Sequence, residues 1–288
     1  MAKAKYTTHL GMVDILPDES PKWRALENII HEEAANFNFE EIRTPIMEQT
    51  ELIKRGIGQL TDIVTKEIFA FTKGDSNYVL RPELTAPVVR AYVQHHLDQR
   101  GGSQKLYYIG PMFRAERPQK GRQRQFHQFG VEVIGSENPV ADVECIAFMM
   151  RIYQRIGIKN FNLKLNSVGD PESRENYKSV LKEYLEPHLE KLSELSQKRF
   201  ETNPMRILDS KEPEDQEFIQ SAPVISDHLN EESKEHFAQV CEMLSSLNIE
   251  YTLDPLLVRG MDYYTRTAFE LTSPDLGSQD ALAGGGRY

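Results

Sequence analysis

Residues 106–135 read LYYIGPMFRAERPQKGRQRQFHQFGVEVIG, and this stretch decides the fold. Its composition is typical of two long strands joined by a basic loop. Successive side chains on a strand point to opposite sides of the sheet, so each strand has two distinct faces. One face of the second strand is mostly apolar and should pack on helices; it carries His127, Phe129, Val131 and Val133.

The opposite face of the second strand carries Phe126, Gln128, Gly130 and Glu132. Hydrogen-bonding groups that are separated by a residue without a side chain suit the floor of a ligand pocket. Burying a carboxylate is costly unless it has a partner, so we expect Glu132 to have one.

The first strand of this stretch alternates in the same way and places Gly110, Met112, Arg114 and Glu116 on one face. The loop between the strands concentrates positive charge; its cations are Arg117, Lys120, Arg122 and Arg124. Two interpretations stay open from the residues alone, an ordinary solvated loop and a binding surface. Strand positions for Arg114 and Glu116 favour the binding surface.

Composition bounds the class of protein. The 288 residues carry a formal net charge of −10, with ordinary apolar content, which is typical of a globular chain with one large domain or two smaller ones. An acidic balance argues against a general nucleic-acid binder, but not against one with a local basic patch. No apolar run is long enough to span a bilayer and no apolar signal segment is present, so we expect a cytoplasmic protein without membrane association.

The cysteines and histidines predict neither a disulfide framework nor a protein-bound metal. Cys145 and Cys241 are far apart, which indicates a reducing compartment, although a bridge between them stays open. No Cys/His spacing resembles a zinc site. His95 and His96 are adjacent on a predicted helix and therefore diverge around it.

Hydrophobic periodicity predicts the other elements. Helices are expected over residues 20–37, 48–55, 85–97, 138–157 and 233–247, the first with Ser20 as N-cap and Pro21 at its first position. Strands are expected over residues 40–45, 68–72, 78–81, 161–168 and 250–253, with a hairpin between the second and the third.

Glu83 and Thr85 lie where the third of these helices begins. Thr85 is either the N-cap of the helix or a ligand contact, and the sequence favours neither. Glu83 is either a solvated surface carboxylate or a charge placed near the positive end of the helix.

Residues 170–232, the helical segment, differ in character from the rest. A leucine stripe at helical spacing runs among many Glu and Lys residues, and Pro187 is expected to kink or split the helix. The stripe comprises Leu181, Leu185, Leu189, Leu192 and Leu195. We predict a small, mainly helical insertion whose charges form a solvated face.

Two further stretches carry unusual residue combinations. Residues 257–270, the arginine–tyrosine peptide, read LVRGMDYYTRTAFE, and residues 281–288, the triple-glycine peptide, read ALAGGGRY. An arginine beside a glycine, followed by paired tyrosines and a strand, is unusual for a pure core segment. Three glycines let a backbone approach a ligand closely, although GGG alone is a weak signal.

Taken together, these stretches resemble the histidyl-tRNA synthetases, a family of class II aminoacyl-tRNA synthetases. FEEIRTPIMEQTEL at 39–52 resembles the first class II motif, which lies at the dimer interface of the family. FRAERPQKGRQRQFHQFGVEVIG at 113–135 resembles the second motif. The arginine–tyrosine and triple-glycine peptides resemble the two histidine-specific peptides.

The resemblance implies an α+β fold, with a mainly antiparallel sheet flanked by helices. It implies a catalytic domain in two parts, 1–169 and 233–288, with the helical insertion at 170–232 between them. The sequence ends inside the second histidine-specific peptide, and it contains neither the third class II motif nor the anticodon-reading domain. We therefore expect a catalytic-domain fragment that is weakly active or inactive by itself.

The resemblance also implies roles for individual residues. The implied partners are L-histidine, ATP with Mg²⁺ as a substrate complex, tRNA(His) and a second copy of the chain in a homodimer. Catalytic roles fall to Arg114 and Arg259. The implied histidine-binding residues are Glu83, Thr85, Arg114, Gln128, Glu132, Arg259, Tyr263, Tyr264 and Tyr288, and the implied ATP-binding residues are Arg114, Glu116, Arg122 and Phe126.

The implied activity is that of a histidine–tRNA ligase, which forms histidyl-adenylate and transfers histidine to the 3′ end of tRNA(His). Attack of a carboxylate on a phosphate needs fixed cations more than it needs a base, and arginine suits phosphate well. One alternative is the synthetase-like regulatory subunit of ATP phosphoribosyltransferase, and another is an interaction domain that has lost the chemistry. Arg114 and Arg259, together with the intact motifs, argue against both.

Overall fold

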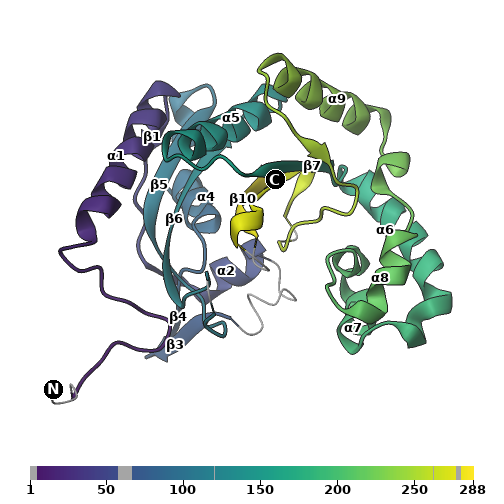
Figure 1. Ribbon diagram of the computed structural model, residues 1–288, viewed down its shortest axis with the longest axis horizontal. Coiled ribbons are helices and arrows are strands. Elements are labelled where there is room, and N and C mark those ends of the chain that lie inside the picture. Colours follow the sequence, from purple (N-terminus) through teal and green to yellow (C-terminus); the bar gives the residue numbers. More distant parts are fainter. Residues whose placement is uncertain (1–4, 58–66, 120, 262, 277–279) are drawn as a thin grey trace. The chain divides into compact units, whose positions relative to one another are not determined.

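A computed structural model describes residues 5–57, 67–119, 121–261, 263–276 and 280–288 (Figure 1). Lys120 of the predicted basic loop therefore lies outside the described residues. The chain divides into two compact units. The first comprises the chain up to Glu137 together with Glu144–Lys159, and the second comprises Asn138–Val143 and Asn160–Tyr288.

The first unit contains two small sheets, with strand orders β1-β5-β6 and β2-β4-β3, and the helices that accompany them. Its elements are α1 (Ser20–Asn36), β1 (Glu40–Glu41), β2 (Met47–Gln49), α2 (Thr50–Ile57), β3 (Phe69–Lys73), β4 (Ser76–Leu80), α4 (Thr85–Gln94), η1 (Leu97–Arg100), β5 (Gln104–Phe113), β6 (Gln125–Ile134) and most of α5 (Val140–Arg155).

Strands β5 and β6 form the antiparallel pair that the sequence predicts, in register from Gln104 opposite Ile134 to Phe113 opposite Gln125. The predicted apolar face of β6 does pack on helices. Its Phe129, Val131 and Val133 contact a buried cluster from α1 and α5, which lie beside the pair in Figure 1. Burying such a side chain contributes about 1.5–3 kcal/mol, so this face anchors the unit.

The other face of the pair is partly covered by α4. Leu84 and Val88 pack there against Leu106 and Met112 of β5, and Phe126 of β6 joins this cluster. Helix α4 therefore lies on the face that was predicted to be a ligand floor, and it covers the apolar part of that face.

Several predicted boundaries in this unit are wrong. Ser20 is the first residue of α1, with Glu19 as the N-cap, and α4 ends at Gln94 instead of residue 97. Strand β5 ends at Phe113, so Arg114 and Glu116 follow the strand instead of lying on it. The cause is the N-terminal segment: the carbonyl of Gly11 accepts hydrogen bonds from the backbone N–H groups of Arg124 and Gln125, at 2.7 and 3.1 Å. The Arg114 N–H still donates to the Arg124 carbonyl at 2.9 Å, but the Arg124 N–H is bound to Gly11 and cannot complete this pair, so the β5–β6 ladder ends there.

The predicted strand over 40–45 shortens to β1, which runs parallel to β5. The carbonyl oxygens of Thr44 and Pro45 instead accept hydrogen bonds from the Arg81 guanidinium, at 2.8 and 3.3 Å. The predicted helix over 48–55 begins at Thr50, because Met47–Gln49 pair with β4 as strand β2.

The second unit contains a four-stranded sheet of order β10-β9-β7-β8 and a group of helices. Its elements are the first turn of α5, β7 (Asn162–Ser167), α6 (Pro171–Leu185), η2 (Glu186–Lys191), α7 (Glu194–Thr202), η3 (Pro204–Ile207), α8 (Pro213–Gln220), η4 (Ile225–His228), α9 (Glu231–Ser246), β8 (Thr252–Leu253), β9 (Thr265–Thr272), η5 (Pro274–Leu276) and β10 (Ala281–Arg287).

Antiparallel pairs dominate both units, since only β1–β5 and β7–β8 run parallel among the described strands. Separate helices and antiparallel strands make this an α+β fold, as predicted. No helix within the described ranges is long and apolar enough to cross a membrane.

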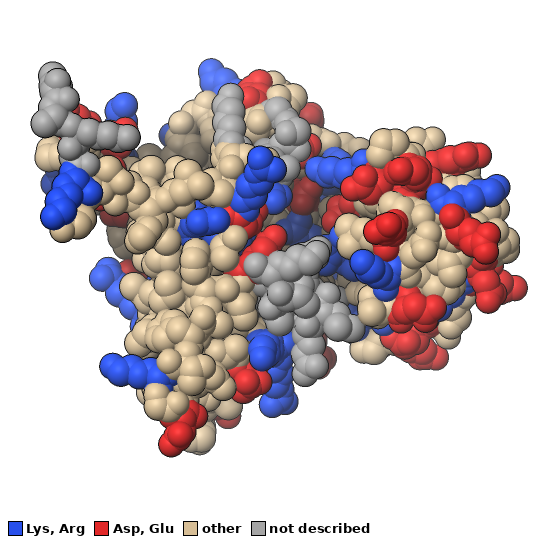
Figure 2. Space-filling model, turned by 90° about the horizontal axis from the view of Figure 1, so that it is seen from below, with Lys and Arg blue, Asp and Glu red and all other residues tan. Residues whose placement is uncertain are grey.

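The helical segment shares a buried core with Val168 and with Ala268 of β9, and all its described regular elements are helical. Pro187 does split the predicted helix, since α6 ends at Leu185 and the 3₁₀ helix η2 follows. Ser193 caps a new helix, α7, with a different phase, so Leu195 is exposed and its predicted place in the stripe is wrong. Figure 2 shows acidic side chains over much of the visible face of this segment.

Asp215 organises the interior of this segment. Its fully buried carboxylate accepts hydrogen bonds from the Ser193 amide and hydroxyl, both at 2.8 Å, and from the hydroxyls of Ser196 and Ser210, at 2.6 and 2.5 Å. These bonds outweigh the effect of burial and lower the pKa of the Asp215 carboxyl. The carboxylate therefore joins α7 and α8 through serine donors.

Candidate active site

Glu83 and Thr85 lie at the start of α4, and the structure rules out one interpretation of each. The helix begins at Thr85 itself, so Thr85 is not its N-cap. Glu83 satisfies the first backbone donors instead: one carboxylate oxygen accepts the Thr85 N–H at 2.6 Å and the other accepts the Ala86 N–H at 2.9 Å. Glu83 is 4% exposed, so it is not a solvated surface carboxylate.

Burial raises the pKa of Glu83, although the hydrogen bonds from Ala86 and Thr85 and the charge of Arg114 oppose this shift. The carboxylate is thus held in place by backbone donors but lacks an ion-pair partner at contact distance among the described residues. A bound cationic group beside it would favour the ionised form.

Glu132 has the partners that its predicted burial required. The Thr85 hydroxyl donates to Glu132 at 2.8 Å, and the Tyr108 hydroxyl donates to the same oxygen at 3.2 Å. Burial raises the pKa of Tyr108 well above its ordinary value, and the charges of Glu132 and Glu83 add to this shift. Thr85 thereby links the two buried carboxylates, because its amide binds Glu83 and its hydroxyl binds Glu132.

Gly130 makes this network possible. It lies opposite Tyr108 in the β5–β6 register, and a Cβ atom at Gly130 would lie 2.3 Å from the Tyr108 hydroxyl oxygen. The absent side chain therefore leaves room for the tyrosine ring to lie across the strand towards Glu132.

Arg114 and Phe126 lie together at the end of the β5–β6 pair. The Arg114 guanidinium carbon is 5.1 Å from the centroid of the Phe126 ring, and its Nε donates to the Pro82 carbonyl at 3.0 Å. Burial lowers the pKa of Arg114, an effect that nearby Glu116, Glu67 and Glu83 oppose. Among the described residues, the other guanidinium nitrogens receive no hydrogen-bond partner, and an anion could take that place.

Glu116 and Arg122 pair with each other in the basic loop. The Arg122 guanidinium donates to the Glu116 carboxylate at 2.8 Å, and the Arg124 side chain donates to the Glu116 carbonyl at 3.2 Å. Arg122 is 44% exposed and Glu116 is 12% exposed. The two implied ATP-binding residues are thus ion-paired with each other in this structure.

Gln128 lies on the same face as Glu132, opposite Gly110. A Cβ atom at Gly110 would lie 2.6 Å from the Arg81 guanidinium, so Arg81 lies flat on the strand beside Gln128. Arg81 is buried, and burial lowers its pKa. Sequence reasoning missed this residue; an arginine placed before the Pro82-Glu83 pair was the available signal.

In the second unit, Arg259 is bound to Glu270. Its guanidinium donates to the Glu270 carboxylate at 2.5 Å, and Gly284 faces Glu270 across the β9–β10 pair. A Cβ atom at Gly284 would lie 2.3 Å from an Arg259 nitrogen. The guanidinium therefore lies flat against β10, and Gly284 is the residue that allows it.

The implied tyrosines of the second unit group together. The ring centroids of Tyr263 and Tyr264 are 4.7 Å apart, and those of Tyr263 and Tyr288 are 5.7 Å apart. Tyr264 also packs on the core of the helical segment. The triple-glycine peptide fits around this group, because a Cβ atom at Gly286 would lie 2.9 Å from the Tyr264 ring.

Asp142 anchors the end of β10, and sequence reasoning missed it because its partners are distant in sequence. Its buried carboxylate accepts hydrogen bonds from His236 at 2.8 Å and Thr267 at 2.6 Å, and it pairs with Arg287 at 2.9 Å. Burial raises its pKa, but these partners outweigh burial and hold the pKa below its ordinary value.

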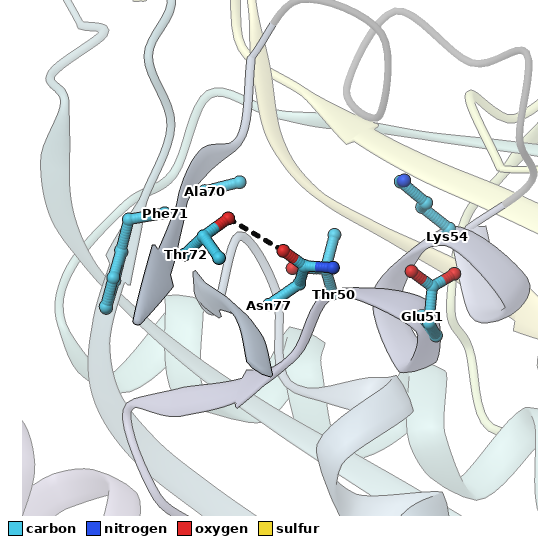
Figure 3. Close-up of a pocket in the computed structure, with 7 residues that line it drawn as sticks. All are labelled: Thr50, Glu51, Lys54, Ala70, Phe71, Thr72 and Asn77. Atoms are coloured by element: carbon cyan, nitrogen blue, oxygen red, sulfur yellow. Dashed lines mark hydrogen bonds between the residues drawn. The ribbon is translucent and has the colours of Figure 1, made fainter. Parts of the chain in front are cut away.

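A cavity of about 260 Å³ lies in the first unit. Figure 3 shows Thr50, Glu51 and Lys54 of α2 on one side and the β3–β4 hairpin with Asn77 on the other. None of the implied site residues lines it. Within the described parts of the chain, no group of three or more His, Cys, Asp or Glu side chains is arranged to hold a metal ion.

Comparison with known proteins identifies the family. The family model described as "Histidyl-tRNA synthetase" matches residues 11–288. This chain belongs to the histidyl-tRNA synthetase family. A histidine–tRNA ligase of Chloroherpeton thalassium is 53% identical over 286 residues, which cover 99% of this chain and 67% of that protein. The chain spans about two thirds of the length of the curated relatives it matches.

Solved structures agree with this family. The apo histidyl-tRNA synthetase of S. aureus is 44% identical, with a TM-score of 0.79, over 98% of this chain and 66% of that one. A Bacillus halodurans protein, described as an ATP phosphoribosyltransferase regulatory subunit/histidyl-tRNA synthetase, is 25% identical, with a TM-score of 0.72, over 100% of this chain and 77% of that one.

Proposed function

We propose that this chain is the catalytic part of a histidine–tRNA ligase. It activates L-histidine with ATP and Mg²⁺ and transfers the histidyl group to the 3′ end of tRNA(His). The observation that carries the proposal is the buried Glu83–Thr85–Glu132 network, which joins the start of α4 to strand β6; Arg114 and Phe126 lie at the end of the same β5–β6 pair. A buried carboxylate that is fixed by backbone N–H groups, beside a second one that accepts from two hydroxyls, suits an amino acid with an ammonium group and an imidazole.

In this proposal, histidine selection rests on polar groups from several parts of the chain. Glu83 accepts from the ammonium group, and Glu132, fixed by Thr85 and Tyr108, receives an N–H of the ligand. Gln128 completes the floor, while Tyr263, Tyr264 and Tyr288 supply aromatic walls and hydroxyls. An apolar amino acid would leave these buried groups unpaired, which gives strong discrimination.

ATP binding rests on the end of the β5–β6 pair. Phe126 offers a ring face for adenine, and Arg114, whose Nε is already held by Pro82, offers its remaining donors to the α-phosphate. Glu116 contacts the base. Arg122 is the exposed partner of Glu116, so we propose that it exchanges this carboxylate for the outer phosphates when ATP binds.

In the activation step, a carboxylate oxygen of histidine bonds to the α-phosphorus while the bond to pyrophosphate breaks. Negative charge builds on the phosphate oxygens, and fixed cations stabilise it. Arg114 and Arg259 are the proposed cations. Arg259 is held by Glu270 and Gly284, so little reorganisation is needed when charge develops.

The remaining proposals concern organisation and setting. We propose a catalytic domain made of residues 1–169 and 233–288, with residues 170–232 inserted in it.

We also propose a cytoplasmic homodimer in which the segment around Pro45 lies near the two-fold axis. Ile46 and Met47 follow Pro45, and both are exposed. They present apolar surface at the start of the edge strand β2, which supports an interface there.

The test is histidine-dependent exchange between pyrophosphate and ATP, followed by charging of tRNA(His), with the full-length protein. The regulatory-subunit alternative, favoured by the similarity to the Bacillus halodurans protein, predicts histidine binding without exchange. Exchange that requires histidine and is not supported by other amino acids would support the ligase. Histidine binding with no exchange would favour the regulator.

A further inference from the structure

The arginine–tyrosine peptide has an irregular backbone in the part that carries Arg259. Its described residues between β8 and β9 form turns and irregular structure instead of a strand or helix. Strands and helices fix a backbone through their own hydrogen bonds, so an irregular stretch depends on other donors for a defined shape. Two of these donors are arginine side chains from the helical segment, Arg206 and Arg174.

Arg206 holds the backbone next to Arg259. Its guanidinium donates to the carbonyl oxygen of Gly260 at 2.8 Å. Arg206 itself is firmly placed, because its neighbours Met205 and Ile207 are buried in the core of the helical segment. Its own carbonyl accepts a hydrogen bond from Arg199 at 3.0 Å. The side chain is 16% exposed, so it is largely withdrawn from solvent.

Arg174 holds the other end of the same stretch. Its guanidinium donates to the carbonyl oxygen of Tyr264. Arg174 lies in the first turn of α6, which is fixed by Asp170: the Asp170 carboxylate accepts the Ser173 N–H at 2.8 Å and the Asn230 amide at 2.7 Å. A rigid helix end therefore supports the backbone of Tyr264.

We propose that Arg206 and Arg174 are positioning residues for histidine activation, acting through Arg259 and Tyr264 respectively. This inference rests on the proposed function. The Gly260 carbonyl belongs to the residue directly after Arg259, so fixing it restrains the backbone one residue beyond the one from which the Arg259 side chain extends. The Tyr264 carbonyl belongs to Tyr264 itself, so fixing it restrains the backbone from which the Tyr264 ring extends. The helical segment thus has a role in the first reaction, before tRNA is involved.

The two arginines give different kinetic signatures. Arg259 acts on charge that develops in the transition state, so losing its placement lowers kcat more than it raises the KM for histidine. Tyr264 contacts the amino acid in the ground state as well, so losing its placement raises the KM for histidine. Displacing a reacting group by about 1 Å costs on the order of 10²-fold in rate, and we expect a loss of roughly 10–100-fold.

The experiment compares Arg206→Ala, Arg174→Ala and wild type in pyrophosphate exchange with the full-length protein, with rates normalised to active sites. Arg206→Ala should lower kcat by about 10–100-fold with the histidine KM within about twofold of wild type. Arg174→Ala should raise the histidine KM by roughly tenfold with a smaller change in kcat. No tRNA is present in this assay, so lost contacts to tRNA cannot produce either result.

Two variants separate positioning from charge and from stability. Lys198→Ala removes an exposed cation from α7 and should leave both constants within about twofold of wild type. Arg206→Lys keeps one charged donor for the Gly260 carbonyl and should recover most of the lost kcat. If Arg206→Ala does not fold, Arg206→Gln replaces it under the same criteria. The glutamine side chain keeps an apolar stem for packing but is too short to reach the Gly260 carbonyl.

A folded Arg206→Ala protein with wild-type kcat would overturn the inference, and so would an equal loss in Lys198→Ala. Equal losses in Arg206→Ala and Arg206→Lys would also overturn it, because they would show that the carbonyl contact is not what matters. Wild-type protein without histidine-dependent exchange would instead refute the proposed function, which keeps the two failures apart.

Discussion

Gly284→Ala is the sharpest test of how Arg259 is held. A Cβ atom at this position would lie 2.3 Å from one Arg259 guanidinium nitrogen, 2.6 Å from the other and 2.5 Å from the carbon between them. Ordinary contact begins near 3.4 Å, so the guanidinium must move away by about 1 Å. Its bond to Glu270 is 2.5 Å long and opposes that movement.

The expected loss in kcat follows from this displacement. A shift of about 1 Å in a group that stabilises the transition state costs on the order of 10²-fold, which equals about 2.7 kcal/mol in activation free energy. Folding stability should change much less, because Gly284 has a backbone conformation that alanine also adopts and the displaced group is a side-chain end. The assay is histidine-dependent pyrophosphate exchange per active site, with thermal unfolding measured in parallel.

Gly285→Ala is the matched control on the same strand. Its added Cβ would lie 2.6 Å from the buried ring of Phe269, not from Arg259. This variant should therefore lower the unfolding temperature while the kcat of the folded fraction stays near wild type. A wild-type kcat in folded Gly284→Ala, or an equal fall in kcat in Gly285→Ala, would refute the proposed constraint on Arg259.

Three further predictions concern buried polar groups. Asp142→Asn should destabilise the protein near neutral pH. Because the folded pKa of Asp142 is lowered, this difference in unfolding free energy should shrink as pH falls below about 4, and urea titrations that show no such trend would contradict it. Gly130→Ala should cost about 1–3 kcal/mol by urea denaturation, because the new methyl group overlaps the Tyr108 hydroxyl; a cost below about 0.5 kcal/mol would show that the ring moves freely. Asp215→Ala should cost more, about 3–5 kcal/mol, because three serines lose their acceptor, and Glu217→Ala on the same helix serves as its exposed control.

The parts of the fold that follow a simple period could be predicted from sequence. Alternation in 125–134 correctly assigned Phe129, Val131 and Val133 to a helix-covered face, because a period of two follows directly from strand geometry. The same pattern could not show where β5 ends. That boundary depends on the Gly11 carbonyl, which lies more than a hundred residues away in sequence and takes the donors of Arg124 and Gln125.

In the candidate site, too, some features could be predicted from sequence and others could not. The need of Glu132 for a partner could be predicted from the cost of burying a carboxylate, but the identity of its partners required the packing of α4 and β5. Thr85 was compatible with capping because threonine is a common N-cap. Glu83 took that role because the Pro82–Leu84 turn brings its carboxylate back to two amides, a geometry that residue preferences do not contain.

Three glycines in the long strands share one structural role: each leaves room for a large polar side chain. Gly130 leaves room for the Tyr108 ring beside Glu132, Gly110 for the Arg81 guanidinium and Gly284 for the Arg259 guanidinium beside Glu270. In each case the missing Cβ lets a large polar side chain lie flat on a strand. Glycine weakens a strand by roughly 0.5–1 kcal/mol relative to alanine, so its use there needs a compensating gain.

That gain is a fixed direction for a polar group at a sheet surface. A guanidinium or phenol pressed against a backbone has few rotamers left, so it is already ordered before a substrate arrives. The triple-glycine peptide was interpreted from sequence as a place where a ligand approaches the backbone. Within the described residues, a Cβ atom would meet Arg259 at Gly284, Phe269 at Gly285, and the Thr267 carbonyl and the Tyr264 ring at Gly286. The glycines therefore act on the proposed site indirectly, by setting where the side chains that face a substrate are able to lie.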